Sequence, residues 1–240
     1  MQEARREWLA PQDVERLTVS QQKIGEGVYG EVFIGRLKLR GKKPVSVAVK
    51  KFRSVVNDGV HEPAPFSIDA HLTRYNRVIS NLKKAGVRMP KMAFVQHEGQ
   101  PVLVSELFKR GSSTKIMDAR SFRETGSQAA RETLETIARI MEAGYTPHFD
   151  SVGFVQTPYR MHPIVFDIDL LAHHPNKATE GVVNDWLFAI FPRDKERRQA
   201  ALDMLIRRVK DYPLRRDLFA LKENYNRWWG WKRRLLSFFR

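Results

Sequence analysis

One glycine pattern, G-x-G-x-x-G, limits what this chain can fold into more than any other feature of the sequence. Gly25, Gly27 and Gly30 form it within "KIGEGVYGEV". In a dinucleotide-binding βαβ unit the third glycine of this pattern begins a helix. Here Gly30 is followed by Glu-Val-Phe-Ile-Gly, whose β-branched and aromatic side chains predict a strand. The pattern therefore predicts a glycine-bearing hairpin and argues against the dinucleotide-binding fold.

A further strand that ends in a lysine follows this hairpin. Residues 41–44, Gly-Lys-Lys-Pro, predict a turn, and residues 45–50 alternate as a strand ending in V-A-V-K. This succession is typical of protein kinases. In them the glycine hairpin covers the phosphates of ATP, and the lysine, here Lys50, contacts the α and β phosphates. The alternative interpretation is an ordinary hairpin with a surface lysine.

The remainder of the first half fits the same arrangement. Residues 54–65 are predicted as a loop and residues 68–84 as a helix with apolar side chains at helical spacing. Residues 87–108 are predicted to contain a second hairpin, with its turn at residues 97–100. Backbone groups at its end would pair with the edge of adenine. The predicted nucleotide-binding residues are Ile24, Gly25, Glu26, Gly27, Val28, Tyr29, Gly30, Val32, Ala48, Lys50, Glu106 and Leu107.

The second half supplies two candidate aspartates. A predicted helix over residues 129–143 leads to His148-Phe149-Asp150, in the place where kinases have H-R-D. An apolar segment, "HPIVFDIDLL", then delivers Asp167. A carboxylate within so apolar a segment is costly to bury without a partner, which favours a metal ligand. We expect Asp150 to be the catalytic base and Asp167 to bind Mg²⁺.

These motifs together resemble the compact bacterial kinases of the lipopolysaccharide core, which phosphorylate heptose and Kdo. The resemblance covers roughly residues 24–191 and includes "LKKAGVRMP", "MEAGYTPHFD", "VFDIDL" and the short path to "NDW". It implies an α+β, bilobal protein-kinase-like fold with a β-rich N-lobe, residues 1–107, and a mainly helical C-lobe, residues 108–240. It also implies ATP and Mg²⁺ as cofactors, a sugar hydroxyl as acceptor and a place at the cytoplasmic face of the inner membrane. Asp185 would hold the backbone of the catalytic loop, and no long activation segment precedes it.

The sequence departs from the family pattern at three positions. Tyr75 stands where a helix Glu should pair with Lys50, Val155 stands where a second metal ligand is expected, and Phe149 replaces the Arg of H-R-D. Gln156 could serve as the second metal ligand only if the loop were shifted. The glycine hairpin is closer to that of protein kinases. A protein Ser/Thr kinase and a non-catalytic nucleotide-binding scaffold, or pseudokinase, therefore stay open as alternatives.

Charge and composition bear on the partners. The chain has 42 basic and 27 acidic residues, and residues 193–240 alone contain 15 basic and 6 acidic ones. This asymmetry predicts an anionic partner, such as lipid, lipopolysaccharide or nucleic acid. The tail "NRWWGWKRRLLSFFR", wound as a helix, gathers its Trp, Leu and Phe on one half, as interfacial membrane helices do. The alternative is a helix packed on its own lobe. Because no nucleic-acid motif accompanies the tail, nucleic acid is the least favoured partner.

Two absences limit the class of protein. The chain has no cysteine, which excludes disulfides and thiol catalysis and fits a reducing compartment. It has no run of 18 apolar residues and no signal-peptide-like N-terminus, so we expect a cytoplasmic protein, peripheral at most on the membrane.

Overall fold

The computed structural model describes residues 11–56, 64–65, 67–107, 115–118, 127–156, 161–173, 175–176 and 178–238. The chain divides into two compact units, of which the first comprises Met1–Thr73 and Pro90–Lys109, and the second Arg74–Met89 and Arg110–Arg240. The division falls within helix α1 (Ile68–Lys84), whose first turns belong to the first unit. The lobe boundary expected after Leu107 stays a prediction.

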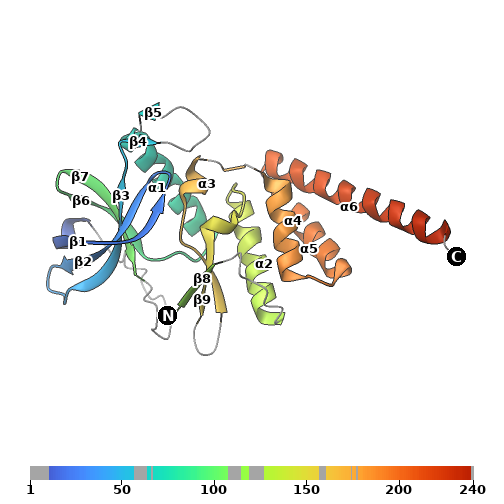
Figure 1. Cartoon of the computed structure of the whole chain (residues 1–240), viewed down its shortest axis with the longest axis horizontal. Coiled ribbons are helices and arrows are strands. Elements are labelled where there is room, and N and C mark those ends of the chain that lie inside the picture. The colour runs from blue at the N-terminus through green and yellow to red at the C-terminus, as the bar shows by residue number, and fades with distance from the viewer. Residues whose placement is uncertain are drawn as a thin grey trace. The chain divides into compact units, whose positions relative to one another are not determined.

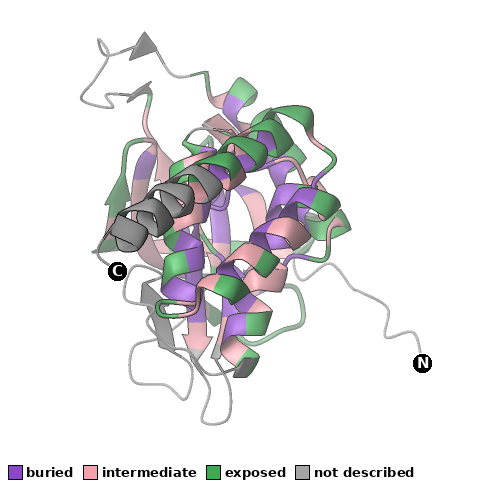
Figure 2. Cartoon of the chain, turned by 90° about the vertical axis from the view of Figure 1, so that its right-hand side faces the viewer, coloured by how far each residue is buried: buried purple, intermediate pink, exposed green. Residues whose placement is uncertain are grey.

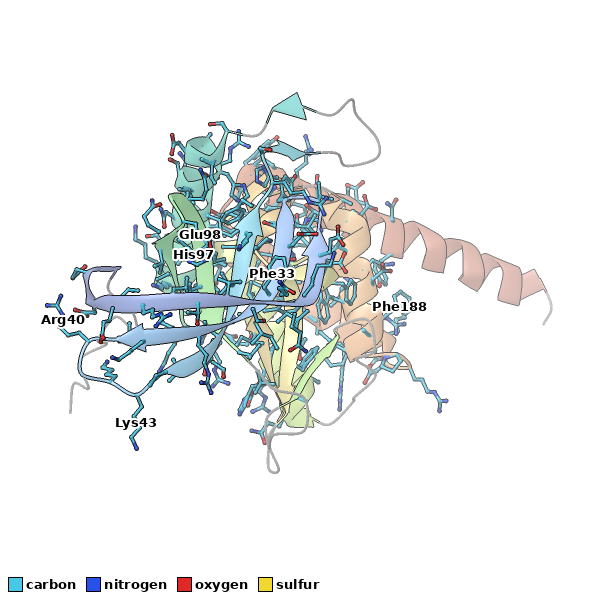
Figure 3. The ribbon with its side chains drawn as sticks, turned by 60° about the vertical axis from the view of Figure 1, so that its left-hand side comes forward. Phe33, Arg40, Lys43, His97, Glu98 and Phe188 are labelled. Carbon is cyan, nitrogen blue, oxygen red and sulfur yellow. The ribbon has the colours of Figure 1, made fainter. Side chains whose placement is uncertain are left out.

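The first unit is built on a five-stranded antiparallel sheet with the order β1-β2-β3-β7-β6 (Figure 1). After the short helix η1 (Pro11–Asp13) come β1 (Val14–Gly27), β2 (Gly30–Leu39), β3 (Val45–Phe52), β6 (Met92–His97) and β7 (Gln100–Glu106). Both predicted hairpins are present. Arg40 and Lys43 lie at the turn between β2 and β3 and point away from the sheet (Figure 3).

The register of these strands separates two faces of the sheet. One face carries a buried apolar cluster of Leu37, Leu39, Val47, Val49, Val95, Val102 and Val104. Because side chains alternate along a strand, Ala48 and Lys50 of β3 point to the opposite face. The V-A-V-K strand is thus amphipathic in the sense that its pattern predicts.

Helix α1 agrees with the helix predicted over residues 68–84. Gly86, two residues past its end, has a φ of 72°, the left-handed conformation common after helix ends, and Val87 N–H donates to the carbonyl of Leu82. The stretch predicted as a loop over residues 54–65 is corrected in part, because β4 (Val55–Val56) and β5 (Ala64–Pro65) pair within it. Two β-branched residues make β4, which the Pro and polar content around it concealed.

The second unit is mainly helical, with α2 (Ser127–Glu142), α3 (Asp169–His173), α4 (Thr179–Ile190), α5 (Lys195–Arg208) and α6 (Tyr212–Phe238). Its buried residues recur along one side of the helices (Figure 2). A small antiparallel sheet of β8 (Lys115–Asp118), β9 (Val152–Gln156) and β10 (Met161–Val165) accompanies them. Of its three strands the sequence predicted only the last, because β10 leads into a long apolar run whereas β8 and β9 do not.

Arg208, at the end of α5, joins that helix to α2. Its Nη1 donates to Glu135 Oε2 at 2.7 Å and its Nε to Glu142 Oε1 at 2.6 Å. These bonds hold the pKa of the Glu135 carboxyl below its ordinary value, mainly through the hydrogen bond from Arg208. A guanidinium that binds two carboxylates one above the other on α2 fixes both the spacing and the rotation of the two helices.

Replacing Arg208 by Met, which keeps the apolar stem, is expected to lower the free energy of unfolding by about 1–2 kcal/mol at pH 7, since the cluster is partly exposed. Because the pKa of Glu135 is lowered by folding, this stabilisation is complete above the unfolded-state pKa of about 4.3 and is lost as the pH falls through the folded-state value. Urea unfolding at pH 7 and pH 3 measures both.

The matched control is Arg216→Met, because Arg216 is largely exposed and its ion pair within the described residues is with its neighbour Asp217. It should change the free energy of unfolding by less than about 0.5 kcal/mol. A difference between wild type and Arg208→Met that is equal at pH 7 and pH 3 would contradict the assigned role of the carboxylates.

Candidate functional site

In the first unit the glycine hairpin and Lys50 lie in one row across the sheet. Gly25 of β1 pairs with Val32 of β2, Val32 with Lys50 of β3, and Lys50 with Leu103 of β7. Residues directly opposite each other on antiparallel strands point to the same face. The sheet therefore places the predicted lysine and the first predicted glycine on one face, away from the apolar cluster. Ala48 is in the next row, opposite Ile34 and Ser105.

Charged side chains hold the two strands together beside the turn of the hairpin. Lys23 Nζ donates to Glu26 Oε2 at 2.7 Å and to Glu31 Oε1 at 3.1 Å, and Arg53 also pairs with Glu26. The hydrogen bonds from Lys23 and Arg53 lower the pKa of Glu26, and those to Glu26 and Glu31 raise the pKa of Lys23. Arg53 N–H also donates to the carbonyl of Tyr29 at 3.1 Å. Glu26, predicted as nucleotide-binding, is thus engaged with the protein's own cations.

Aromatic side chains hold the tip of the hairpin. Tyr29 stacks on His71 of α1 with ring centroids 5.7 Å apart, and His71 in turn meets Phe52 edge to face at 4.7 Å. His71 is buried. The sequence motif did not point to His71 or Arg53, because both lie far from it along the chain.

The three glycines of the motif differ in how much space a side chain would have at each position. A Cβ on Gly30 would lie 2.3 Å from the carbonyl oxygen of Lys51, so close packing of β2 on β3 requires glycine there. A Cβ on Gly27 would meet nothing within 4 Å, and one on Gly25 only the side chain of Val32 at ordinary contact distance. The fold itself therefore requires Gly30 but neither Gly25 nor Gly27, and their small size leaves space beside the backbone for a phosphate.

The other predicted nucleotide contacts lie at the ends of strands. Ile24 and Val28 are exposed large apolar residues beside the glycines. At the end of β7, Glu106 N–H donates to the carbonyl of Lys91 at 2.8 Å, so this donor serves the protein's own backbone. An adenine contact in the predicted segment would then fall to Leu107 and not to Glu106 N–H.

In the second unit the backbone brings the segments of Asp150 and Asp167 together. Asp150 lies in the short helix η3 (Phe149–Ser151), and Asp167 follows β10 directly. Phe166 N–H donates to the carbonyl of Ser151 at 3.1 Å, and Val165 pairs with Val152. The residue after Asp150 is therefore bonded to the residue before Asp167, as a catalytic loop with a returning strand requires.

The burial of the two aspartates after β10 differs from the sequence-based expectation. Asp167 is only half-buried, whereas Asp169 is buried and accepts a hydrogen bond from the buried hydroxyl of Tyr75. Asp169 N–H in turn donates to Asp167 Oδ1 at 3.0 Å. Burial of Asp167 thus gives no support for a metal ligand there, and one of its oxygens caps the start of α3. Gln156 ends β9, and its side chain lies outside the described residues.

Trp186, not Asp185, contacts the backbone of the predicted catalytic loop. The indole Nε1 of the fully buried Trp186 donates to the carbonyl of Pro147 at 2.6 Å, while Asp185 is exposed. The Trp186 ring also stacks on Phe149 at 4.2 Å with the planes 16° apart. The aromatic residue in place of the Arg of H-R-D is therefore one half of a stacked pair that holds the loop on α4.

The donor chemistry fits a nucleotide-bound Mg²⁺. Among the described residues, no group of three His, Cys, Asp or Glu side chains could hold a metal ion alone. Magnesium at nucleotide sites needs less, because one or two carboxylates together with phosphate oxygens and waters bind it. Asp167 offers such a carboxylate, oriented by the N–H of Asp169.

Comparisons with known proteins give a limited picture. The sequence matches no protein-family model and no curated protein. A solved structure of the Helicobacter pylori proinflammatory kinase CtkA is similar, with 12% identity over 87% of this chain and 91% of that chain and a TM-score of 0.41. A likeness at this level carries no argument on its own. The chain's own elements, a five-stranded antiparallel sheet in the first unit and mainly helices in the second, with only a short connection between α3 and α4, give the α+β class that the sequence predicts.

The contrast between Gly30 and Gly27 predicts opposite effects on stability. Gly30→Ala should lower the melting temperature, because its Cβ would overlap the backbone of β3. Gly27→Ala should leave it unchanged or raise it slightly, since alanine restricts the unfolded chain by about 0.4–1 kcal/mol. Differential scanning calorimetry of both variants measures this. A loss of stability in Gly27→Ala as large as that in Gly30→Ala would refute the distinction.

Proposed function

We propose that this protein is an ATP-dependent phosphotransferase that moves the γ-phosphate of ATP to a hydroxyl. The Gly25–Val32–Lys50 row in a kinase-like sheet supports it most, because it puts a lysine and an open glycine backbone on one face. When bound, Mg²⁺ neutralises the negative charge of the phosphates. Lys50 would bind phosphate oxygens, Asp167 would bind the metal, and Asp150 would orient the acceptor hydroxyl and accept its proton.

The acceptor that we favour is a sugar of the lipopolysaccharide type. Ordinary protein kinases bind peptide substrates along a long segment between the metal-binding strand and the helix that follows. In this chain α3 ends at His173 and α4 begins at Thr179. So short a connection offers little room for a peptide, and the excess of basic residues suits an anionic acceptor. A protein hydroxyl is the alternative acceptor.

A nucleotide-binding protein without catalysis is the second candidate. Two observations favour it: Tyr75 hydrogen-bonds to Asp169 from the place expected for the helix Glu, and Val155 occupies the position of the second metal ligand. Such a protein would still bind ATP through Lys50 and the hairpin. Turnover separates the two candidates, whereas binding does not.

The tail is the basis for a membrane partner. Within the described residues, no helix has the length and apolarity needed to cross a bilayer. The first half of α6 packs on its own unit, since Leu214, Leu218 and Leu221 are buried and Tyr225 Oη donates to Asn184 Oδ1 at 2.8 Å. From residue 226 the side chains, including the three tryptophans, lie outside the described residues. We place the membrane contact in this second half, at the cytoplasmic face.

Substitutions in the two units should separate binding from chemistry. Lys50→Ala should weaken ATP binding about 10- to 100-fold, as expected for a lost charged hydrogen bond. Asp167→Ala should abolish the effect of Mg²⁺ on nucleotide affinity. Asp150→Ala should bind ATP normally and slow transfer by about 10²–10⁴-fold, the usual contribution of a general base. Calorimetry with a non-hydrolysable ATP analogue and single-turnover assays measure these effects.

Neighbouring residues supply matched controls. Lys51 lies on the other face of β3, 3.7 Å from Glu98 in the turn between β6 and β7 (Figure 3), so Lys51→Ala should bind ATP as wild type does. For Asp150→Ala the control is Asp185→Asn, which changes an exposed aspartate and should transfer phosphate as wild type does. Equal ATP affinity in Lys50→Ala and Lys51→Ala would remove the basis of the proposal. Normal binding with no turnover on any hydroxyl acceptor would favour the non-catalytic candidate.

The full chain should sediment with anionic vesicles at low salt and persist in part at high salt. Basic residues near an anionic surface contribute about 1 kcal/mol each and are screened by salt, whereas an apolar helix face is not. A chain that ends before Trp228 should stay folded and bind ATP but not vesicles. If truncation instead lowers the melting temperature and the full chain binds no vesicles, the tail packs on its own unit.

A further inference from the structure

Tyr75 and Asp169 form a buried polar pair within the second unit. The side chain of Tyr75, in the middle of α1, is 1% exposed, and that of Asp169, at the start of α3, is 6% exposed. The phenol hydroxyl of Tyr75 donates a hydrogen bond to Asp169 Oδ1. A buried carboxylate is costly without hydrogen-bond donors, so this bond strongly constrains where Asp169 can lie.

Asp169 in turn fixes the side chain of Asp167 through a hydrogen bond. Its backbone N–H donates to Asp167 Oδ1 at 3.0 Å. A carboxylate that accepts such a bond from two residues further along the chain has its side-chain rotation fixed. Tyr75, Asp169 and Asp167 therefore form a chain of two hydrogen bonds that begins on α1 and ends at the candidate metal ligand.

We infer that Tyr75 is a positioning residue for Asp167, which it orients for Mg²⁺ through Asp169. The inference depends on the proposed role of Asp167 as metal ligand. It gives a role to Tyr75, which stands at the helix position where the kinase pattern has a glutamate paired with the lysine. Loss of a residue that orients a metal ligand through hydrogen bonds commonly lowers metal affinity about 10- to 100-fold.

A purely structural role for the same bond is the competing explanation, and the chain offers a matched control for it. Tyr145 is also a buried tyrosine, 7% exposed, and its hydroxyl is also in a hydrogen bond that involves α1, because it accepts from Asn81 Nδ2 at 3.0 Å. Tyr75→Phe and Tyr145→Phe remove the same atom from two bonds to the same helix. Tyr145→Phe should lower the melting temperature by roughly 2–4 °C, as expected for the loss of one neutral hydrogen bond in a chain of this size. Tyr75→Phe should lower it by at least as much, because it takes a donor from a buried carboxylate.

Only Tyr75→Phe should change the response to metal. With calorimetry of a non-hydrolysable ATP analogue at increasing Mg²⁺, we expect the Mg²⁺ concentration for half-maximal affinity to rise about 10-fold or more. In Tyr145→Phe it should equal that of wild type. Added to Asp167→Ala, the Tyr75 substitution should cause no further loss, because both act on one ligand.

The outcomes separate this inference from the proposed function. If wild type and Asp167→Ala respond to Mg²⁺ alike, the metal role of Asp167 fails and the inference fails with it. If Asp167→Ala loses the response but Tyr75→Phe keeps the wild-type one, only the inference is overturned. Should Tyr75→Phe not fold, Asp169→Asn replaces it, since the amide keeps the backbone bond but weakens the acceptor. An unchanged Mg²⁺ response in Asp169→Asn would then overturn the inference.

Discussion

The antiparallel register of β2 against β3 decides what the first unit presents on each face of its sheet. Gly30 opposite Phe52 lets the two strands approach so closely that any side chain would meet the carbonyl of Lys51. From that fixed point the pairing aligns Val32 with Lys50, and the alternation of side chains puts Lys50 on the face opposite the apolar cluster. A shift by one residue would turn Lys50 into the apolar cluster, so glycine packing and lysine placement depend on the same register.

In the second unit the candidate residues lie in short, irregular segments. Few backbone hydrogen bonds hold these segments, so side-chain contacts must fix them in place. Trp186 holds one such segment by a hydrogen bond to Pro147 and by stacking on Phe149. Asp169 holds the other through Tyr75. Buried aromatic side chains with one polar atom suit this task, since the ring supplies apolar contact and the polar atom fixes orientation.

Residues that differ from the kinase pattern still make structural contacts at two positions. Phe149, where the kinase pattern has an arginine, makes a stacked contact that keeps the loop in place. Tyr75, where the pattern has a glutamate, bonds to the segment of the proposed metal ligand. In both cases an aromatic residue takes over a position where ordinary kinases use charge. An aromatic contact does not depend on a phosphorylated partner, which agrees with the short connection before α4.

The sequence alone determined both hairpins, α1, α2 and the placing of Lys50, because periodicity, turn residues and short-range pairing are local. Local signals did not reveal β8 and β9. They also did not reveal that Trp186 contacts the loop where Asp185 was expected, or that Asp169 is buried where Asp167 was expected to be. Only the tertiary structure decided these, because the contacts that matter join residues 39 and 94 positions apart. Two aspartates separated by a single residue in an apolar segment look alike in sequence, and the partner that buries one of them lies on a distant helix.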